Sequence, residues 1–317
     1  MNFFIHIGTH KTGSTALQHF LLINRAKLQE HGFLYPETGL KDAGHHKIAW
    51  ASRSKDTFPQ LNKLMQLVRG EANKLKCPNI ILSSEEFEFG RDINHLKTAL
   101  AGDNCKIIVF LRRQDTLLES EYNQHVKMHL TKYSHSIFKF HFDHDFNQRF
   151  NYKYLCNLWT HKFGQEAMSV VSYDNCSREP QGIFKEFLNV IKVPFDDGFL
   201  LPEEGHANAS LPSKAILYLA RLNTLSLTKN QHQLAIRILV DEFASQKKQA
   251  LLSLNDRKLL WARYEGVNGF VENTYNTSCF VEPSETEHND EYLDFCNDFD
   301  VNMYAKIIKR LLGGGIN

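Results

Sequence analysis

Several features are scarce in this sequence, and each scarcity excludes a class of protein. No apolar run approaches the roughly 18 residues that span a membrane, so we expect no integral membrane segment. Neither sign of charge dominates, because the sequence contains 37 Lys and Arg and 36 Asp and Glu, which gives a net charge of +1. We therefore expect no general affinity for polyanions and no nucleic acid partner, while a local basic pocket stays compatible with this balance.

The cysteines are also few and scattered. None of the six is spaced from another as a C-x-x-C pair, which argues against a structural zinc site and a disulfide framework. A glycine-containing loop begins as early as Gly8 and leaves no room for a signal peptide. With 42% hydrophobic and 23% charged residues, the chain of 317 residues is predicted to be a globular cytoplasmic enzyme.

Short apolar runs alternate with longer amphipathic stretches over much of the chain. Four runs are predicted to be buried strands, at residues 3–7, 80–82, 107–111 and 169–173. One helix is predicted from residue 14 to about residue 31, and another follows residues 179–180. This alternation predicts an α/β fold of the P-loop type, with three α/β/α layers around a central parallel sheet and the first strand in its middle. Ligands of such sheets bind at the carboxyl ends of the strands.

The C-terminal third has a different pattern. Residues 206–275 are mainly helical, and residues 282–300 are acidic before a short helix at 301–312. We expect one domain over residues 1–280, in which the additional C-terminal helices pack on the same core. An acidic extension that ends in a short helix is expected over residues 281–317.

The loop after the first predicted strand carries the strongest functional signal. It opens a helix and contains two glycines, whose backbone can wrap closely around a phosphate. The residues are Gly8-Thr9-His10-Lys11-Thr12-Gly13-Ser14-Thr15. A nucleotide-hydrolysing P-loop would carry Lys after the second glycine, but Ser14 stands there and the lysine is Lys11. A lysine inside the turn is better placed beside the bridging oxygen between the bound phosphate and the group that leaves it.

The loop resembles the 5′-phosphosulfate loop of sulfotransferases that use PAPS (3′-phosphoadenosine 5′-phosphosulfate). Cytosolic members of that family carry P-K-S-G-T-T, and carbohydrate and bacterial members carry K-T-G-[ST]-[ST], often followed by L-Q as in Leu17-Gln18. The resemblance implies that the loop binds PAPS and that Lys11 stabilises the leaving phosphate. The donor-binding residues it implies are His10, Lys11, Thr12, Gly13, Ser14 and Thr15.

A second part of the resemblance follows the strand at 107–111. In the family, an Arg at this strand end and a Ser eight residues later bind the 3′-phosphate of PAPS, and Arg112 and Ser120 have that separation. Arg113 stays an alternative, because Arg113-Gln114 replaces the usual Asn-Pro or Asp-Pro. Tyr173 begins a segment similar to the Y-E-D of cytosolic members, which implies that it lies near the adenine.

Sulfuryl transfer to a hydroxyl also needs a base that takes the proton. Glycan and tyrosyl-protein members of the family use a Glu in the region after the second strand, whereas cytosolic small-molecule members use a His. We favour Glu85 as the base, with Glu86 next. His46, in the polar connection before that strand, is a histidine candidate for the same role of base.

The resemblance therefore predicts a PAPS-dependent sulfotransferase of a bacterial, carbohydrate-like branch. It would move the sulfuryl group to a hydroxyl or amine of a saccharide, glycolipid or small metabolite, release adenosine 3′,5′-bisphosphate and require no metal. One alternative is a P-loop small-molecule kinase that uses ATP and Mg²⁺, although Ser14 replaces its lysine. A non-catalytic glycan-binding protein of the same fold is the other, and the presence of both Lys11 and Arg112 argues against it. The acceptor determinants are expected at residues 36–60 and 127–150, and the sequence predicts no oligomeric state.

Overall fold

The computed structural model describes most of the chain, in two compact units. The described residues are 1–88, 93–143, 146–202, 211–246, 249–285, 292–295 and 297–313. The first unit consists of Met1–Arg113, Asn151–Ala207 and Gly266–Phe280, and the second of Gln114–Phe150, Asn208–Glu265 and Val281–Asn317. The domain boundary expected after residue 280 stays a prediction. Among the described residues, no helix has both the length and the apolar character that crossing a membrane requires.

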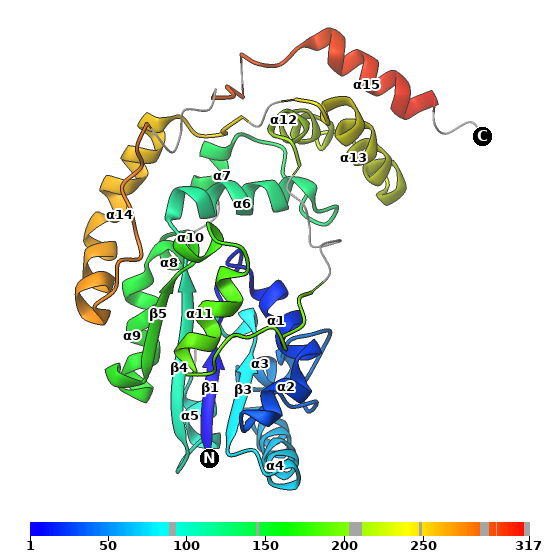
Figure 1. The fold of residues 1–317 in the computed structure, drawn as a ribbon. Helices are drawn as coiled ribbons and strands as arrows, with labels where there is room; N and C mark the ends of the chain where they lie inside the picture. The colour runs from blue at the N-terminus through cyan, green and yellow to red at the C-terminus, as the bar shows by residue number, and fades with distance from the viewer. Residues whose placement is uncertain are drawn as a thin grey trace. The chain divides into compact units, whose positions relative to one another are not determined.

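A five-stranded parallel sheet forms the centre of the first unit. Its strands are β1 (Asn2–His6), β2 (Phe33–Leu34), β3 (Asn79–Ser83), β4 (Asn104–Leu111) and β5 (Met168–Ser172). They lie in the order β2-β3-β1-β4-β5, which Figure 1 shows for the four longer strands, so the first strand is central as predicted. β2 was not predicted, because two residues are too short for an alternation pattern to appear in the sequence.

Helices cover both faces of this sheet, which confirms the predicted α/β fold with a central parallel sheet. The helices that lie wholly in the first unit are α1 (Ser14–Ile23), α2 (Arg25–Glu30), α3 (His46–Ala51), α4 (Phe58–Leu75), α5 (Asn94–Ala99), α9 (Tyr152–Phe163), α10 (Tyr173–Ser177) and α11 (Gly182–Val190), with 3₁₀ turns η1 (Glu85–Phe87) and η2 (Gln165–Ala167). On one face, α1 and α11 pack over Ile108 and Phe110 of β4, and the stacked rings of Phe20 and Phe184 join the two helices. On the other face, α4 places Arg69 over the ring of Phe3, and α9 packs against β4 and β5.

The helix predicted over residues 14–31 is divided into α1 and α2, which corrects that expectation. The division lies at Asn24, whose buried side chain donates a hydrogen bond to the carbonyl of Phe20 and another to the carbonyl of Leu200. Its amide oxygen accepts from the backbone N–H of Leu200. A short polar side chain that bonds the backbone in this way competes with the helical ladder and ends the helix.

The helices and strands assigned in the described part of the second unit are all helices, as the sequence predicts for residues 206–275 and 301–312. Its helices are α6 (Gln114–Lys127), α7 (Ile137–Asp143), α8 (Phe146–Phe150), α12 (Ser213–Leu222), α13 (Lys229–Phe243) and α15 (Val301–Gly313), and α14 (Leu254–Tyr275) has residues in both units. Arg257 of α14 is buried and forms ion pairs of 2.8 Å with Asp115 and with Glu119 of α6. This buried cluster fixes the helix that carries Ser120.

Two fully buried histidines flank Ser83 at the end of β3. His6 Nδ1 lies 2.8 Å from the Ser83 hydroxyl, and His45 Nδ1 accepts a hydrogen bond from the Ser83 backbone N–H. Burial lowers the pKa of His6 to about 3, and burial likewise lowers the pKa of His45 to about 3. Both imidazoles are therefore neutral in the folded protein at ordinary pH.

These histidines predict a specific acid sensitivity. The unfolded chain takes up their protons near pH 6.5 and the folded chain only near pH 3. The contribution of the two neutral histidines to stability is therefore fully present above pH 6.5 and is lost as the pH falls from 6.5 toward 3. Each histidine lowers the free energy of unfolding by about 1.4 kcal/mol per pH unit within that window. His6→Asn should remove one of the two contributions, as measured by urea unfolding at about pH 5.5 and about pH 4.5.

The control for this measurement is His19→Asn, because His19 is exposed on α1. That variant should keep the pH slope of the unmodified protein. A His6→Asn slope equal to that of the unmodified protein would contradict the interpretation.

Candidate functional site

The loop between β1 and α1 has an unusual backbone. Gly8, Lys11 and Gly13 have positive φ angles of 39°, 65° and 74°, and Lys11 is the only one of these three with a side chain. The loop is closed by its threonines, because Thr9 Oγ1 donates to the carbonyl of Phe110 at 2.8 Å and Thr12 Oγ1 donates to the carbonyl of Thr9 at 2.6 Å. The loop is therefore held both on itself and on the neighbouring strand β4.

The two glycines allow close approaches that any side chain would block. A Cβ atom on Gly13 would lie 2.6 Å from Ile183 Cδ1, and one on Gly8 would lie 2.9 Å from Ser14 Oγ and 3.1 Å from Glu85 Cα. Ser14 is buried with its hydroxyl on the Thr9 carbonyl, whereas Thr15 is exposed. The loop backbone thus lies directly against the turn after β3, which carries Glu85.

Arg112 connects the end of β4 to the loop. Its guanidinium Nη1 donates to the carbonyl of Lys11 at 2.9 Å and lies over the ring of Tyr173, with 5.1 Å between Cζ and the ring centroid. Tyr173 Cε2 is in turn 3.4 Å from the Cβ position of Gly13. Three sequence-predicted residues from distant parts of the chain, Lys11, Arg112 and Tyr173, therefore meet at the carboxyl end of the sheet.

The neighbouring Arg113 has a different environment. It is buried, and its backbone N–H donates to the Asp174 carboxylate at 2.6 Å. Ser120, the other residue predicted to bind the 3′-phosphate, is half-buried on α6 in the second unit. Its convergence with Arg112 on one phosphate stays a prediction.

Glu88, which the sequence did not identify as a site residue, bonds to the loop between β1 and α1. Glu88 Oε2 accepts the backbone N–H of His10 at 3.0 Å and lies 2.7 Å from His10 Nδ1. The Glu88 side chain is only 7% exposed. The one sequence signal was its place two residues beyond Glu86, in a segment where several glutamates follow one another. The contact fixes His10 at the start of the turn that contains Lys11.

Glu85 and His46, the two types of base candidate, are brought together. His46 Nδ1 lies 3.9 Å from Glu85 Oε2 and 2.8 Å from the hydroxyl of Ser84. The ring of His46 stacks on Trp50 with centroids 5.9 Å apart. Glu85 Oε2 also accepts a hydrogen bond of 2.7 Å from Gln18 Nε2.

Glu86 is engaged elsewhere. Its carboxylate forms an ion pair with Arg53, and its backbone carbonyl accepts a second bond from the same guanidinium. Burial alone would raise the pKa of Glu86, but hydrogen bonds from Trp50 and Arg53 outweigh it and hold the pKa below its ordinary value. Of the two adjacent glutamates, Glu85 is thus the one in contact with Gln18 and His46.

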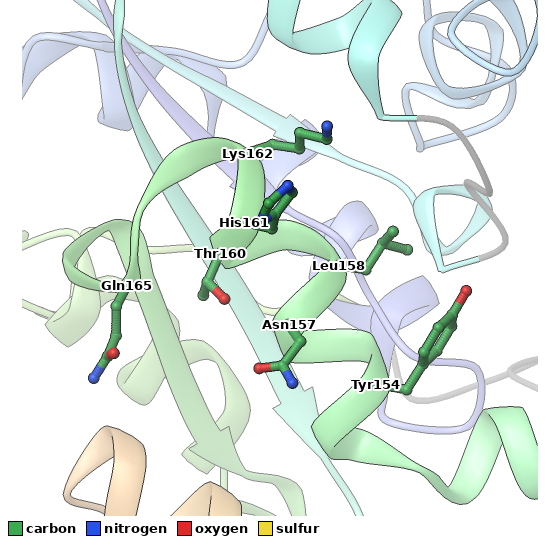
Figure 2. A pocket seen from close by; sticks show the side chains of 7 residues that line it. All are labelled: Tyr154, Asn157, Leu158, Thr160, His161, Lys162 and Gln165. Carbon is green, nitrogen blue, oxygen red and sulfur yellow. The ribbon is translucent and has the colours of Figure 1, made fainter.

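An open hollow of about 590 Å³ lies on the surface of α9 (Tyr152–Phe163). None of the residues that line it takes part in the contacts described above. Figure 2 shows Tyr154, Leu158 and His161 along the helix, Lys162 in its last turn and Gln165 on the segment that follows it. No sequence-predicted site residue lines this hollow.

The family described as "Sulfotransferase domain" matches residues 3–211, which is more than half of the chain and includes the loop, Glu85, Arg112 and Tyr173. No curated protein matches the sequence.

Three solved structures are among the matches to this chain. A sulfotransferase from Alicyclobacillus acidocaldarius is 14% identical, with 87% of this chain and 96% of that chain covered and a TM-score of 0.45. The sulfotransferase domain of the olefin synthase from Synechococcus PCC 7002 is 16% identical, covers 78% and 95%, and has a TM-score of 0.37. The sulfotransferase domain from the curacin biosynthetic pathway is 13% identical, covers 84% and 97%, and has a TM-score of 0.33.

Proposed function

The chain belongs to the sulfotransferase family, and on that premise we propose that it transfers a sulfuryl group from PAPS to a hydroxyl or amine of a saccharide, glycolipid or small metabolite. The observation that carries the proposal is the meeting of Arg112, the Lys11 carbonyl and the Tyr173 ring beside the glycine loop. The saccharide and the bacterial branch rest on the resemblance of residues 11–18 to the K-T-G-[ST]-[ST] loop with L-Q. The cytoplasm is proposed as its compartment, in keeping with the free thiols of the described cysteines.

The residues present suit the donor chemically. PAPS presents phosphosulfate and 3′-phosphate anions together with a purine ring, and it supplies the sulfuryl group that is transferred. The loop offers Lys11, the exposed hydroxyl of Thr15 and the backbone N–H of Ser14 at the start of α1, with two glycines where a Cβ would intrude. Arg112 offers a second cation for the 3′-phosphate, and the Tyr173 ring beneath its guanidinium places an aromatic side chain near the purine in this assignment. In this assignment His10, Thr12 and Gly13 shape the turn.

The proposed reaction needs two further groups from the protein. A bond forms between the acceptor oxygen and sulfur while the bond from sulfur to the bridging phosphate oxygen breaks. Glu85 takes the proton of the acceptor hydroxyl, and the ammonium of Lys11 stabilises the charge that develops on the bridging oxygen. His46, which lies beside Glu85, is the alternative base. No step of this reaction calls on a metal.

Isothermal titration calorimetry with two nucleotides tests the proposal without knowledge of the acceptor. Adenosine 3′,5′-bisphosphate, the product of the donor, should bind more tightly than ADP with Mg²⁺. Magnesium should not improve binding of the bisphosphate. Tighter binding of ADP with Mg²⁺ would favour a P-loop kinase, and binding of glycans without either nucleotide would favour a non-catalytic protein.

Replacement of Arg112 tests the 3′-phosphate assignment. Arg112→Ala should weaken binding of adenosine 3′,5′-bisphosphate about 10–100-fold, because hydrogen bonds to a charged partner are lost. Binding of adenosine 5′-phosphate, which lacks the 3′-phosphate, should change little. The comparison is needed because Arg112 also holds the Lys11 carbonyl, and damage to the loop alone would weaken both ligands equally.

Arg113→Ala is the matched comparison. A selective loss of 3′-phosphate binding in that variant, with normal binding in Arg112→Ala, would transfer the assignment to Arg113.

A further inference from the structure

Gln18 is a buried polar residue that the proposed mechanism leaves without a role. It lies in α1, one turn beyond the loop, with 2% of its surface exposed. Its side-chain Nε2 donates to Glu85 Oε2 at 2.7 Å, across 67 residues of sequence. A buried amide of this kind is costly unless it is bonded, so the contact is a defined feature of the site.

The chemistry on both sides determines the direction of this amide. A carboxylate only accepts hydrogen bonds, so the NH₂ end of Gln18 must face Glu85. The oxygen end faces Gly44, where a Cβ would lie 2.9 Å from Gln18 Oε1 and 2.8 Å from His46 Nε2. The absence of a side chain at Gly44 therefore makes room for the Gln18 amide and the His46 ring together.

We propose that Gln18 is a positioning residue that holds one carboxylate oxygen of Glu85, so that the other is aimed at the acceptor proton. The inference rests on the proposed role of Glu85 as the base. Rotation about the last bond of a glutamate is soft, and a donor on Oε2 selects one orientation of the group. Because the same glutamine is part of the helix that begins at the donor loop, it also ties the base to the element that binds the donor.

A double-mutant cycle separates this role from simple packing. Gln18→Met keeps the length of the side chain and removes the amide, and Glu85→Gln removes the base. The assay uses PAPS as donor and water as acceptor, followed by release of inorganic sulfate. Gln18→Met should lower kcat about 10-fold with unchanged affinity for adenosine 3′,5′-bisphosphate. In the Glu85→Gln background the same replacement should have no further effect on kcat.

Each other result has a distinct meaning. An unchanged kcat in Gln18→Met, or the same 10-fold loss again in the Glu85→Gln background, would overturn the positioning role while leaving Glu85 as the base. Full activity of Glu85→Gln would overturn the base assignment and, with it, this inference. Gln66→Met is the matched control, because Gln66 is exposed on α4, and it should keep the rate of the unmodified protein.

A spectroscopic measurement covers the case in which Gln18→Met does not fold. The side-chain amide signals of Gln18 in the nitrogen-15 NMR spectrum should move when Glu85→Gln replaces the carboxylate by a neutral amide. The signals of Gln66 should not move. Unchanged Gln18 signals would show that no bond to the Glu85 carboxylate exists in solution and would overturn the proposal.

Discussion

Glu85→Gln should lower the rate constant of sulfuryl transfer about 10²–10⁴-fold, which is the usual share of a general base. Gln is nearly isosteric with Glu, so the shape of the site is kept while the proton acceptor is lost. The Gln18 contact can also persist, since an amide oxygen accepts the bond that the carboxylate accepts now. Affinity for adenosine 3′,5′-bisphosphate should therefore be unchanged in calorimetry, and the loss should appear in single-turnover rates.

The neighbouring glutamate is the control for this experiment. Glu86 is paired with Arg53 and bonded by Trp50, so Glu86→Gln should retain most of the rate. A loss confined to KM in Glu85→Gln would make Glu85 an acceptor-binding residue instead. Full activity of Glu85→Gln with an inactive His46→Gln would move the role of base to His46.

Lys11→Ala should lower the rate constant about 10²–10³-fold, the loss seen when one preorganised charge-stabilising group is removed. Nucleotide affinity should fall much less, because charge on the bridging oxygen develops only in the transition state. Ala suits the comparison, since Lys11 has a φ of 65° and Ala meets the same backbone strain that Lys already bears. Single-turnover rates and calorimetry on the same variant separate the two effects.

Two further variants test the reason for this loss. Lys11→Met keeps most of the side chain and should be as slow as Lys11→Ala, because the charge is what acts. Lys63→Ala, at an exposed position of α4, should keep the normal rate. Equal losses in rate and in nucleotide affinity for Lys11→Ala would assign Lys11 to ground-state binding alone.

The sequence by itself determined the elements whose signals are local. Four of the five strands, the parallel sheet with β1 in its centre and the loop at residues 8–15 follow from apolar runs, helical periods and glycine positions within short windows. The position of Arg112 at a strand end was predicted in the same way, because an apolar run followed directly by two arginines is recognised from the local sequence alone. The division of the first helix at Asn24 was missed, since its cause is a bond to Leu200, far away in the chain.

Only the tertiary structure decided how the side chains of the site are paired. Glu85 and Glu86 are adjacent and chemically identical, yet one contacts Gln18 and the other Arg53. The bond between Glu88 and His10 and the approach of Arg112 to the Lys11 carbonyl join residues 78 and 101 positions apart. The physical reason is that a carboxylate or guanidinium can bond any suitable partner within about 3 Å, and which partner comes that close depends on how the strands and helices pack rather than on sequence spacing.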